Sequence, residues 1–244
     1  MTNPDSWNPS IERLPVLHIP NNGRVVIVAP HPDDETLGLG GLIFDWKRAG
    51  IDIRVLIISD GSASHVHFHS PSALAEMRKE EALSAAAVLG IEGCITFLGF
   101  PDGGLTNLHS ELVAAIRSNL DTEDRCEVEH GDSEERNGAH CIVLAPRMND
   151  GHPDHDACAQ AAAEVAATSP GVSHWSYGVW TWTQPPFAGV LAGASRWPIS
   201  DKGYKAKWGA ISKYVSQVTP ILGEQIVTDR LLQSLAVRTE VVWC

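Results

Sequence analysis

The sequence is poor in positive charge and lacks a long apolar run. Lysine and arginine number 18 against 30 aspartate and glutamate residues, which gives a formal net charge of −12. Nucleic-acid binding needs a basic surface that neutralises phosphates, so no nucleic-acid partner is expected. The chain has neither a basic start followed by an apolar core nor an uninterrupted apolar run of about 18 to 20 residues. We therefore expect a cytoplasmic protein without membrane insertion.

Cysteine is also scarce, and its spacing excludes two kinds of site. The five cysteines are odd in number, widely separated and contain no C-x-x-C pair. A disulfide framework and a thiolate zinc knuckle both need closer or paired spacing. Reduced, mostly buried thiols are expected instead, at Cys94, Cys126, Cys141, Cys158 and Cys244.

Short apolar runs alternate with helical patterns along most of the chain. Strands are predicted at 25–29, 53–59, 94–98 and 141–145, and helices at 35–49, 72–89, 108–120 and 156–167. This alternation predicts an α/β fold with a mostly parallel central sheet and helices on both faces. At 244 residues we expect one domain spanning 1–244.

Two segments depart from this alternation. The acidic stretch 121–138 (DTEDRCEVEHGDSEERNG) is predicted to be an exposed insertion. From about residue 170 the pattern is less regular: YGVWTWTQPP predicts a strand that ends at Pro185, and 204–218 predicts a helix with a basic face.

Two similar motifs follow two of the predicted strands. His31 begins H-P-D-D-E directly after the first strand, and H-P-D-H at 152–155 follows the strand at 141–145. The carboxyl ends of parallel strands meet at one edge of a sheet, so the two loops should converge. Histidine and carboxylate side chains from two loops could form a site for zinc or iron(II), with proline stiffening each loop.

Simpler explanations exist for each motif alone. Asp33, Asp34 and Glu35 could be favourable charges at a helix N-terminus, and a single loop histidine is usually structural. The repetition of histidine, proline and aspartate after two apolar strands favours the metal site.

Several motifs together resemble the LmbE-like, or PIG-L, family of metal-dependent N-deacetylases. The resemblance rests on APHPDDETLGLGG with the downstream GHPDH, and extends through SDG, RKEEALSAAAVLG and FLGFPDGGL. YKAKWGAISKYVSQ matches more loosely. The resemblance implies a Rossmann-like fold and a single zinc ion, with iron(II) as the alternative, held by His31, Asp34 and His155.

The same resemblance implies the roles of the neighbouring residues. Asp33 would be the general base that takes a proton from the attacking water. His152 would protonate the departing amine, stabilise the oxyanion, or both, while Asp154 orients that imidazole or has a structural role. Glu35 is expected to hold the loop rather than bind metal.

Substrate contacts are predicted at two further residues. In related deacetylases the residues corresponding to Arg78 and Asp102 contact sugar hydroxyls, although Arg78 could also be solvated charge and Asp102 a turn residue. Trp180 and Trp182 could stack on a sugar or belong to the core. The histidines at 65, 67 and 69 could form a second metal site, but a metal-free rim is favoured because no carboxylates accompany them.

The resemblance predicts zinc-dependent removal of an acetyl group from an N-acetylglucosaminyl or related amino-sugar conjugate. Two alternatives remain: a noncatalytic metal-retaining carbohydrate-binding protein, and an amidase acting on a non-sugar N-acyl substrate. A homo-oligomer also remains open. A dinucleotide site is disfavoured because the glycine spacing would need glycine at Ile43, and a serine hydrolase because GSASH lacks the second glycine of G-x-S-x-G.

Overall fold

A computed structural model describes residues 7–18, 23–65, 70–120, 140–186, 189–220 and 225–244. The acidic stretch 121–138 and two of the three loop histidines, at positions 67 and 69, lie outside the described residues, so those predictions stay untested. No described helix is long and apolar enough to cross a membrane.

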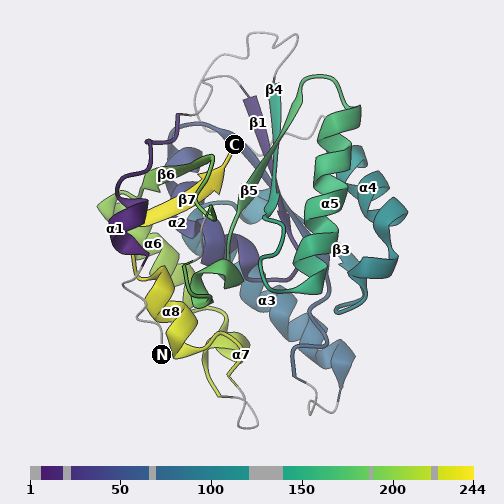
Figure 1. Cartoon of the computed structure of the whole chain (residues 1–244). Coiled ribbons are helices and arrows are strands. Elements are labelled where there is room, and N and C mark those ends of the chain that lie inside the picture. Colours follow the sequence, from purple (N-terminus) through teal and green to yellow (C-terminus); the bar gives the residue numbers. More distant parts are fainter. Residues whose placement is uncertain (1–6, 19–22, 66–69, 121–139, 187–188, 221–224) are drawn as a thin grey trace.

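The described strands form one seven-stranded sheet in the order β3-β2-β1-β4-β5-β7-β6 (Figure 1). The first five pair in parallel, and β7 pairs antiparallel with both β5 and β6. The predicted α/β class and mostly parallel sheet are confirmed. The strands are β1 (Gly23–Ala29), β2 (Asp52–Ser59), β3 (Ile95–Phe100), β4 (His140–Pro146), β5 (Val172–Tyr177), β6 (Ala194–Pro198) and β7 (Thr239–Trp243).

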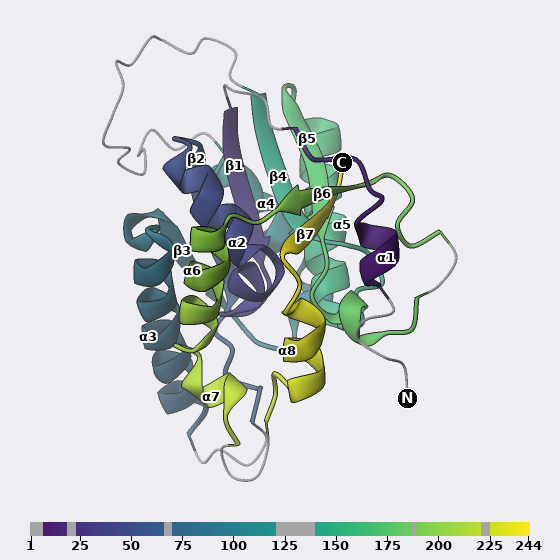
Figure 2. The same cartoon turned by 90° about the vertical axis from the view of Figure 1, so that its left-hand side faces the viewer.

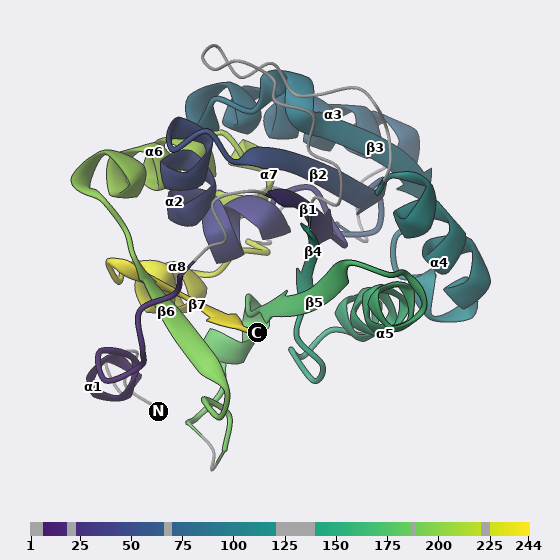
Figure 3. The same ribbon diagram turned by 90° about the horizontal axis from the view of Figure 1, so that it is seen from above.

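Helices cover both faces of this sheet, as the view along it shows (Figure 3). On one face lie α2 (Asp34–Arg48), α3 (Pro71–Leu89) and α6 (Asp201–Ile211), which stand in front in Figure 2. On the other lie α4 (His109–Ser118) and α5 (Pro153–Thr168). Alternate residues of β1 enter the two cores: Val25 and Ile27 join the first, and Val26 and Val28 the second.

The C-terminal part corrects one prediction and refines another. YGVWTWTQPP does not continue as a strand to Pro185: β5 ends at Tyr177, and η4 (Trp180–Thr183) is a 3-10 helix. The hydrogen bonds that Val179, Trp180 and Thr181 donate to a buried carboxylate replace strand pairing. The predicted helix at 204–218 is two helices, α6 and α7 (Val215–Val218). The remaining elements are α1 (Asn8–Ile11), η2 (Glu92–Cys94), η3 (Leu105–Asn107) and α8 (Asp229–Leu235).

The connectivity reverses between β1 and β4. From β1 the chain proceeds outward through β2 and β3, then returns to β4 on the other side of β1. In an open parallel sheet, such a switch point leaves a crevice at the carboxyl ends of the strands, where ligands bind. Both histidine motifs emerge at this point, from β1 and from β4.

Candidate metal centre

Each histidine motif joins a buried strand to the N-terminus of a helix. Asp33 precedes α2 with φ of 138°, a conformation rare for a non-glycine residue and costing on the order of 1–3 kcal/mol. His152 caps α5, whose first residue is Pro153, a position that suits the fixed φ of proline. The strain at Asp33 marks the first loop as a functional candidate, because such conformations cluster at active sites.

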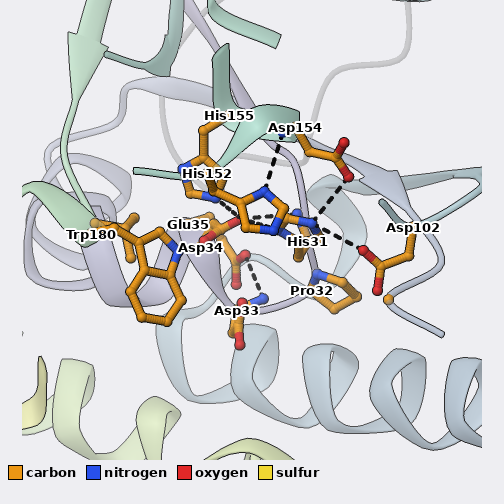
Figure 4. Close-up of polar contacts among 12 residues, drawn as sticks. His31, Pro32, Asp33, Asp34, Glu35, Asp102, His152, Asp154, His155 and Trp180 are labelled. Atoms are coloured by element: carbon orange, nitrogen blue, oxygen red, sulfur yellow. Dashed lines mark hydrogen bonds and ion pairs between the residues drawn. The ribbon is translucent and has the colours of Figure 1, made fainter. Parts of the chain in front are cut away.

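The two loops bring His31, Asp34 and His155 together (Figure 4). The Oδ2 atom of Asp34 lies 3.1 Å from Nδ1 of His31 and 3.2 Å from Nε2 of His155. All three residues are buried. The structure therefore places both predicted histidine ligands against one carboxylate oxygen of the third predicted ligand, Asp34.

Two of the separations among these donor atoms, those from Asp34 to each histidine, suit a small divalent ion. Two ligand atoms that each lie about 2.0–2.1 Å from a tetrahedral zinc ion are about 3.3 Å apart, close to the separations observed. His155 Nε2 is buried and makes no hydrogen bond among the described residues, although it touches Asp34. Its other ring nitrogen, Nδ1, lies 2.8 Å from Oδ2 of Asp150. A hydrogen bond from one nitrogen to a carboxylate, with the other left to a cation, is typical of metal-binding histidine.

Among the described residues, two groups of side chains bring their potential ligand atoms close enough together to hold an ion, and the predicted set of His31, Asp34 and His155 is not one of them. Within the described residues, the potential ligand atoms of His31, His152 and His155 lie within 4.8 Å of one another, and so do those of His31, Asp102 and Asp154. His31 belongs to both groups as well as to the predicted set. The His31 ring nitrogen Nε2 lies 3.2 Å from Asp102 and 3.4 Å from Asp154, while Nδ1 faces Asp34.

The charges of this cluster favour protons or a cation. Burial opposes the charge of His155, but Asp34 and Asp150 outweigh it and raise its pKa to about 9. The pKa of His31 is raised for the same reason, against its burial, by Asp102, Asp154 and Asp34. Burial likewise opposes the charge of Asp34, yet His155 and His31 hold its pKa well below the usual range. A bound divalent ion would displace the imidazole protons.

Asp33, which precedes Asp34 in the chain, contacts a different partner. Burial is the largest influence on this carboxyl and raises its pKa to about 8, against the lowering influence of Arg78. The Arg78 atom Nη2 lies 3.2 Å from Oδ2 of Asp33 and donates to the Pro32 carbonyl at 2.8 Å, while Nη1 donates to Gly61. Arg78 is only 2% exposed, so it is not solvated surface charge.

His152 and Asp154 contact each other differently from the expectation. The backbone N–H of Asp154 donates to Nδ1 of His152 at 3.2 Å, which leaves Nε2 to carry the proton of the neutral ring. The Asp154 carboxylate instead accepts hydrogen bonds from the backbone of Gly103 and Leu105 and faces His31. Burial and the nearby imidazoles of His31 and His155 lower the pKa of His152.

Asp102 is also engaged within the protein. Its Oδ1 lies 3.2 Å from His31 Nε2, and its Oδ2 accepts a hydrogen bond from the Ala63 backbone at 2.9 Å. Figure 4 shows Asp102 and Trp180 on opposite sides of the histidine cluster. The structure thus places Asp102 against a predicted metal ligand as well as at the cavity.

A cavity of about 290 Å³ opens beside these residues. One part of its lining is polar and charged, and another is apolar. The polar part includes His31, Asp33, Asp34, Ser64, Arg78, Asp102, His152 and Gln217, and the apolar part Leu37, Ala63, Trp180, Ile226 and Val227. Trp182 does not line it and packs instead on Trp7 and Trp243.

Glycines beside the first motif serve packing. A Cβ on Gly38 would lie 2.4 Å from the Tyr177 ring, and one on Gly41 would lie 2.5 Å from the Ile199 side chain. These contacts account for Gly38 and Gly41 without a dinucleotide. Glu35 holds the loop as expected, since it accepts hydrogen bonds from Thr36 and Tyr214 at 2.6 Å.

Three buried polar residues of this region were not predicted from the sequence: Asp150, Tyr214 and Gln217. Asp150 lies five residues before His155 in MNDGHPDH, so its proximity to the second motif was the available signal. Tyr214 and Gln217 lie within the loosely matching late segment, but nothing in their local pattern indicates that Tyr214 bonds to Glu35 or that Gln217 lines the cavity.

Comparisons with known proteins match this chain to deacetylases. The family model "PIG-L: GlcNAc-PI de-N-acetylase" matches residues 26–166, more than half of the chain. A diacetylchitobiose deacetylase of Thermococcus kodakarensis is 34% identical over 139 residues, which cover 54% of this chain and 45% of that protein. A probable N-acetyl-alpha-D-glucosaminyl L-malate deacetylase 2 of Bacillus anthracis is 29% identical over 154 residues, 62% of each chain. The matches thus span about half to three fifths of these relatives.

Similarity of fold extends further than similarity of sequence. The zinc-inhibited form of teicoplanin deacetylase Orf2 superimposes with a TM-score of 0.66 at 17% identity and covers 90% of this chain and 97% of that one. Its fold therefore matches the sheet and helices described above. With the family model covering both histidine motifs, we conclude that the chain belongs to the PIG-L, or LmbE-like, family of deacetylases.

Proposed function

We propose that this protein is a metal-dependent hydrolase that removes the acetyl group from an N-acetylglucosaminyl or related amino-sugar conjugate. The observation that carries the proposal is the convergence of His31 and His155 on one oxygen of Asp34, with Asp33 beside them in a 290 Å³ cavity. The names of the two curated relatives support the substrate class, because both describe deacetylases of N-acetylglucosamine compounds.

We assign the metal to His31, Asp34 and His155, with zinc as the ion and iron(II) as the alternative. Imidazole nitrogens and one carboxylate suit both ions. When bound, such an ion lowers the pKa of water from 15.7 to about 7 and polarises a carbonyl oxygen. This assignment follows the family resemblance, and the neighbouring sets that include His152 or Asp102 are the alternatives, since their ligand atoms lie within 4.8 Å of one another.

Asp33 is proposed to act as the general base. Its pKa of about 8 shows how strongly burial favours proton uptake, and a nearby cation would bring that value toward neutrality. A base is most effective when its pKa lies near the operating pH. Arg78 holds the carboxylate through Oδ2, so the other oxygen remains to accept a proton from the attacking water.

His152 is proposed to protonate the departing amine. Because Nδ1 accepts a backbone hydrogen bond, its N–H is directed from Nε2, the atom that can donate to substrate. The neutral ring is favoured by the lowered pKa, and it can also stabilise negative charge on the reacting carbonyl oxygen by donating a hydrogen bond. Asp154 is proposed to set this geometry through its backbone and to fix His31 through its carboxylate.

We propose that the sugar lies in the cavity, with Arg78 and Asp102 on one side of it and the apolar part of the lining on the other. Both polar residues line the cavity, although each also bonds within the protein. They would therefore contact hydroxyl groups with their remaining hydrogen-bond capacity. We also propose that residues 1–244 form a single domain, because one sheet contains strands from both the N-terminal and the C-terminal third of the described chain.

Amine release tests this function. We expect the zinc-loaded protein to release amine from diacetylchitobiose and related N-acetylglucosaminyl conjugates, and a chelator to stop it. Asp33→Asn should lower kcat by about 10² to 10⁴-fold without loss of bound zinc, since general base catalysis contributes that much. Full activity of Asp33→Asn would refute the base assignment.

The same assay separates the alternatives. Zinc-dependent binding of these conjugates without amine release would identify a noncatalytic carbohydrate-binding protein. Release only from N-acyl compounds without a sugar would identify an amidase of another substrate class. Asp156→Asn is the matched control, because Asp156 lies in the same helix as His155. Among the described residues, its side chain accepts one hydrogen bond, from the exposed backbone N–H of Asn149.

A further inference from the structure

Asp150 lies behind the candidate metal centre, in the loop between β4 and His152. It is fully buried and does not line the cavity. Burying a carboxylate is costly unless hydrogen bonds satisfy its oxygens. Its hydrogen-bond partners therefore indicate its role, and they belong to two parts of the structure.

The first partner is His155. Oδ2 of Asp150 lies 2.8 Å from Nδ1 of that ring. This contact keeps a proton on Nδ1 and turns the lone pair of Nε2 toward Asp34, 3.2 Å away. Both the tautomer and the rotation of the ring are thereby fixed.

The second set of partners belongs to the start of η4. The backbone N–H of Val179 lies within 3.2 Å of both oxygens, that of Trp180 donates to Oδ2 at 3.1 Å, and that of Thr181 donates to Oδ1 at 2.9 Å. The Thr181 hydroxyl donates to Oδ1 at 2.5 Å. Four donors within three consecutive residues fix this turn, and the turn carries the Trp180 side chain into the cavity wall.

We propose that Asp150 is a positioning residue that couples the metal ligand His155 to the Trp180 wall of the substrate cavity. This inference rests on the proposed function, since it takes His155 as a ligand and Trp180 as a surface for the N-acetylated sugar. One carboxylate then sets both the affinity for a divalent ion and the shape of the site that receives the ring.

The arrangement explains two features of the sequence. The YGVWTWTQPP segment does not continue β5, because the backbone N–H groups of Val179 and Trp180 donate to Asp150 instead of to a neighbouring strand. Trp180 and Trp182 consequently separate, one at the cavity and the other packed on Trp7 and Trp243. An aromatic ring beside a sugar adds both apolar contact and orientation.

Cobalt binding is the direct test of the metal arm. Partners of a metal-binding histidine typically change metal affinity or activity about 10- to 100-fold when removed. We expect Asp150→Asn to weaken Co²⁺ binding within that range and to alter its visible absorption spectrum, because Asn can present its N–H₂ group to Nδ1. Asp156→Asn, the same change in the same loop–helix segment, should leave both unchanged.

Substrate kinetics test the cavity arm. At saturating zinc, Trp180→Ala should raise KM for diacetylchitobiose about threefold to tenfold with unchanged Co²⁺ affinity. Asp150→Asn should raise KM by a similar factor in addition to its metal defect. The double variant should show a KM no higher than Trp180→Ala alone, because both changes remove the same wall. Multiplicative KM effects, or unchanged Co²⁺ affinity in Asp150→Asn, would overturn the coupling.

A second variant protects the test against misfolding. Thr181→Val removes the hydroxyl bond to Asp150 and leaves His155 untouched. It should shift Co²⁺ affinity and KM in the same direction by smaller factors, and no shift in either would count against the proposal. If the wild-type protein releases no amine, the proposed function fails, whereas Co²⁺ titration and calorimetry with N-acetylglucosamine still decide this inference.

Discussion

Two buried charged clusters lie along helix α2, one at its N-terminus and one near its middle. In the middle, Lys207 Nζ lies 2.7 Å from Oε1 of Glu240, and the two Glu240 oxygens accept the backbone N–H groups of Gly41 and Leu42. Both side chains are only 2% exposed. One positive and one negative charge meet there, with further hydrogen bonds to the carboxylate.

The N-terminal cluster has a large excess of negative charge. Arg78 pairs with Asp33, and the other cationic candidates are imidazoles. Burial raises the pKa of Asp33 to about 8 and also raises that of Glu35. The pKa values of the other four carboxylates are lowered, in each case with a neighbouring imidazole among the causes. The carboxylates concerned are Asp33, Asp34, Glu35, Asp102, Asp150 and Asp154.

The difference teaches how buried charge can be assigned a role. The Lys207–Glu240 pair is balanced in charge and serves the packing of α2 against α6 and β7. An unbalanced cluster is completed by protons or by a cation. Substitutions in the Lys207–Glu240 pair should change stability, and those in the N-terminal cluster should change metal binding and catalysis.

The largest expected effect comes from removing a ligand of the unbalanced cluster. Asp34→Ala or His155→Ala should abolish metal retention and lower turnover by more than about 10⁴-fold, because water near the site regains a pKa near 15.7. Metal analysis after dialysis and amine release measure both. Lys207→Met is the contrasting variant, and its folded protein should keep one metal ion. Full metal content in Asp34→Ala would show that another donor set, such as one including His152, holds the ion.

The next effect concerns the balanced pair. Lys207→Met leaves Glu240 buried without its counter-charge, and breaking such a pair costs about 3–5 kcal/mol of unfolding free energy. Urea unfolding with a chelator present measures this cost without a contribution from metal. The double change of Lys207→Met with Glu240→Gln should recover part of the loss, since Gln can still accept the Gly41 N–H. A loss under about 1 kcal/mol for Lys207→Met would remove the distinction between the clusters.

The unbalanced cluster was largely predictable from sequence, and the balanced one was not. His31 and His155 each follow a short buried strand, so elementary sheet geometry brings their loops together, and the family resemblance selects Asp34 as their companion. Lys207 and Glu240 lie 33 residues apart on a helix and a strand of irregular pattern. No periodic pattern of residues near either position predicts that the two side chains meet.

Long-range hydrogen bonds account for the other misses. The residues of η4 were expected to extend a strand because Trp180 and Trp182 alternate, a pattern that strands favour. Asp150, about 30 residues away, accepts their N–H groups and turns the chain instead. Sequence periodicity predicts which side chains are buried, but it does not predict where a carboxylate distant in the sequence accepts hydrogen bonds from the backbone.

A moderate effect is expected where the protein partly balances its own cluster. Arg78 contacts Gly61, Pro32 and Asp33 through two nitrogens of one planar group, which a lysine ammonium cannot reproduce. Arg78→Lys should therefore lower kcat about 10-fold through misplacement of Asp33, since general base catalysis depends on geometry. Bound zinc should stay at the wild-type level. Loss of zinc in this variant would mean that Arg78 supports the ligands rather than the base.

The smallest effect is expected for a charged pair outside both clusters. Arg238 and Asp201 form an ion pair at the surface, with side chains 60% and 84% exposed, and Arg238 also lies 4.7 Å from the Tyr204 ring centroid. Water and salt screen such a pair, which is worth about 0–1 kcal/mol. Asp201→Asn should lower the unfolding free energy by less than about 1 kcal/mol, and 1 M salt should erase most of that difference. A loss as large as that of Lys207→Met would contradict the argument that burial, rather than pairing itself, separates the structural charges from the incidental ones.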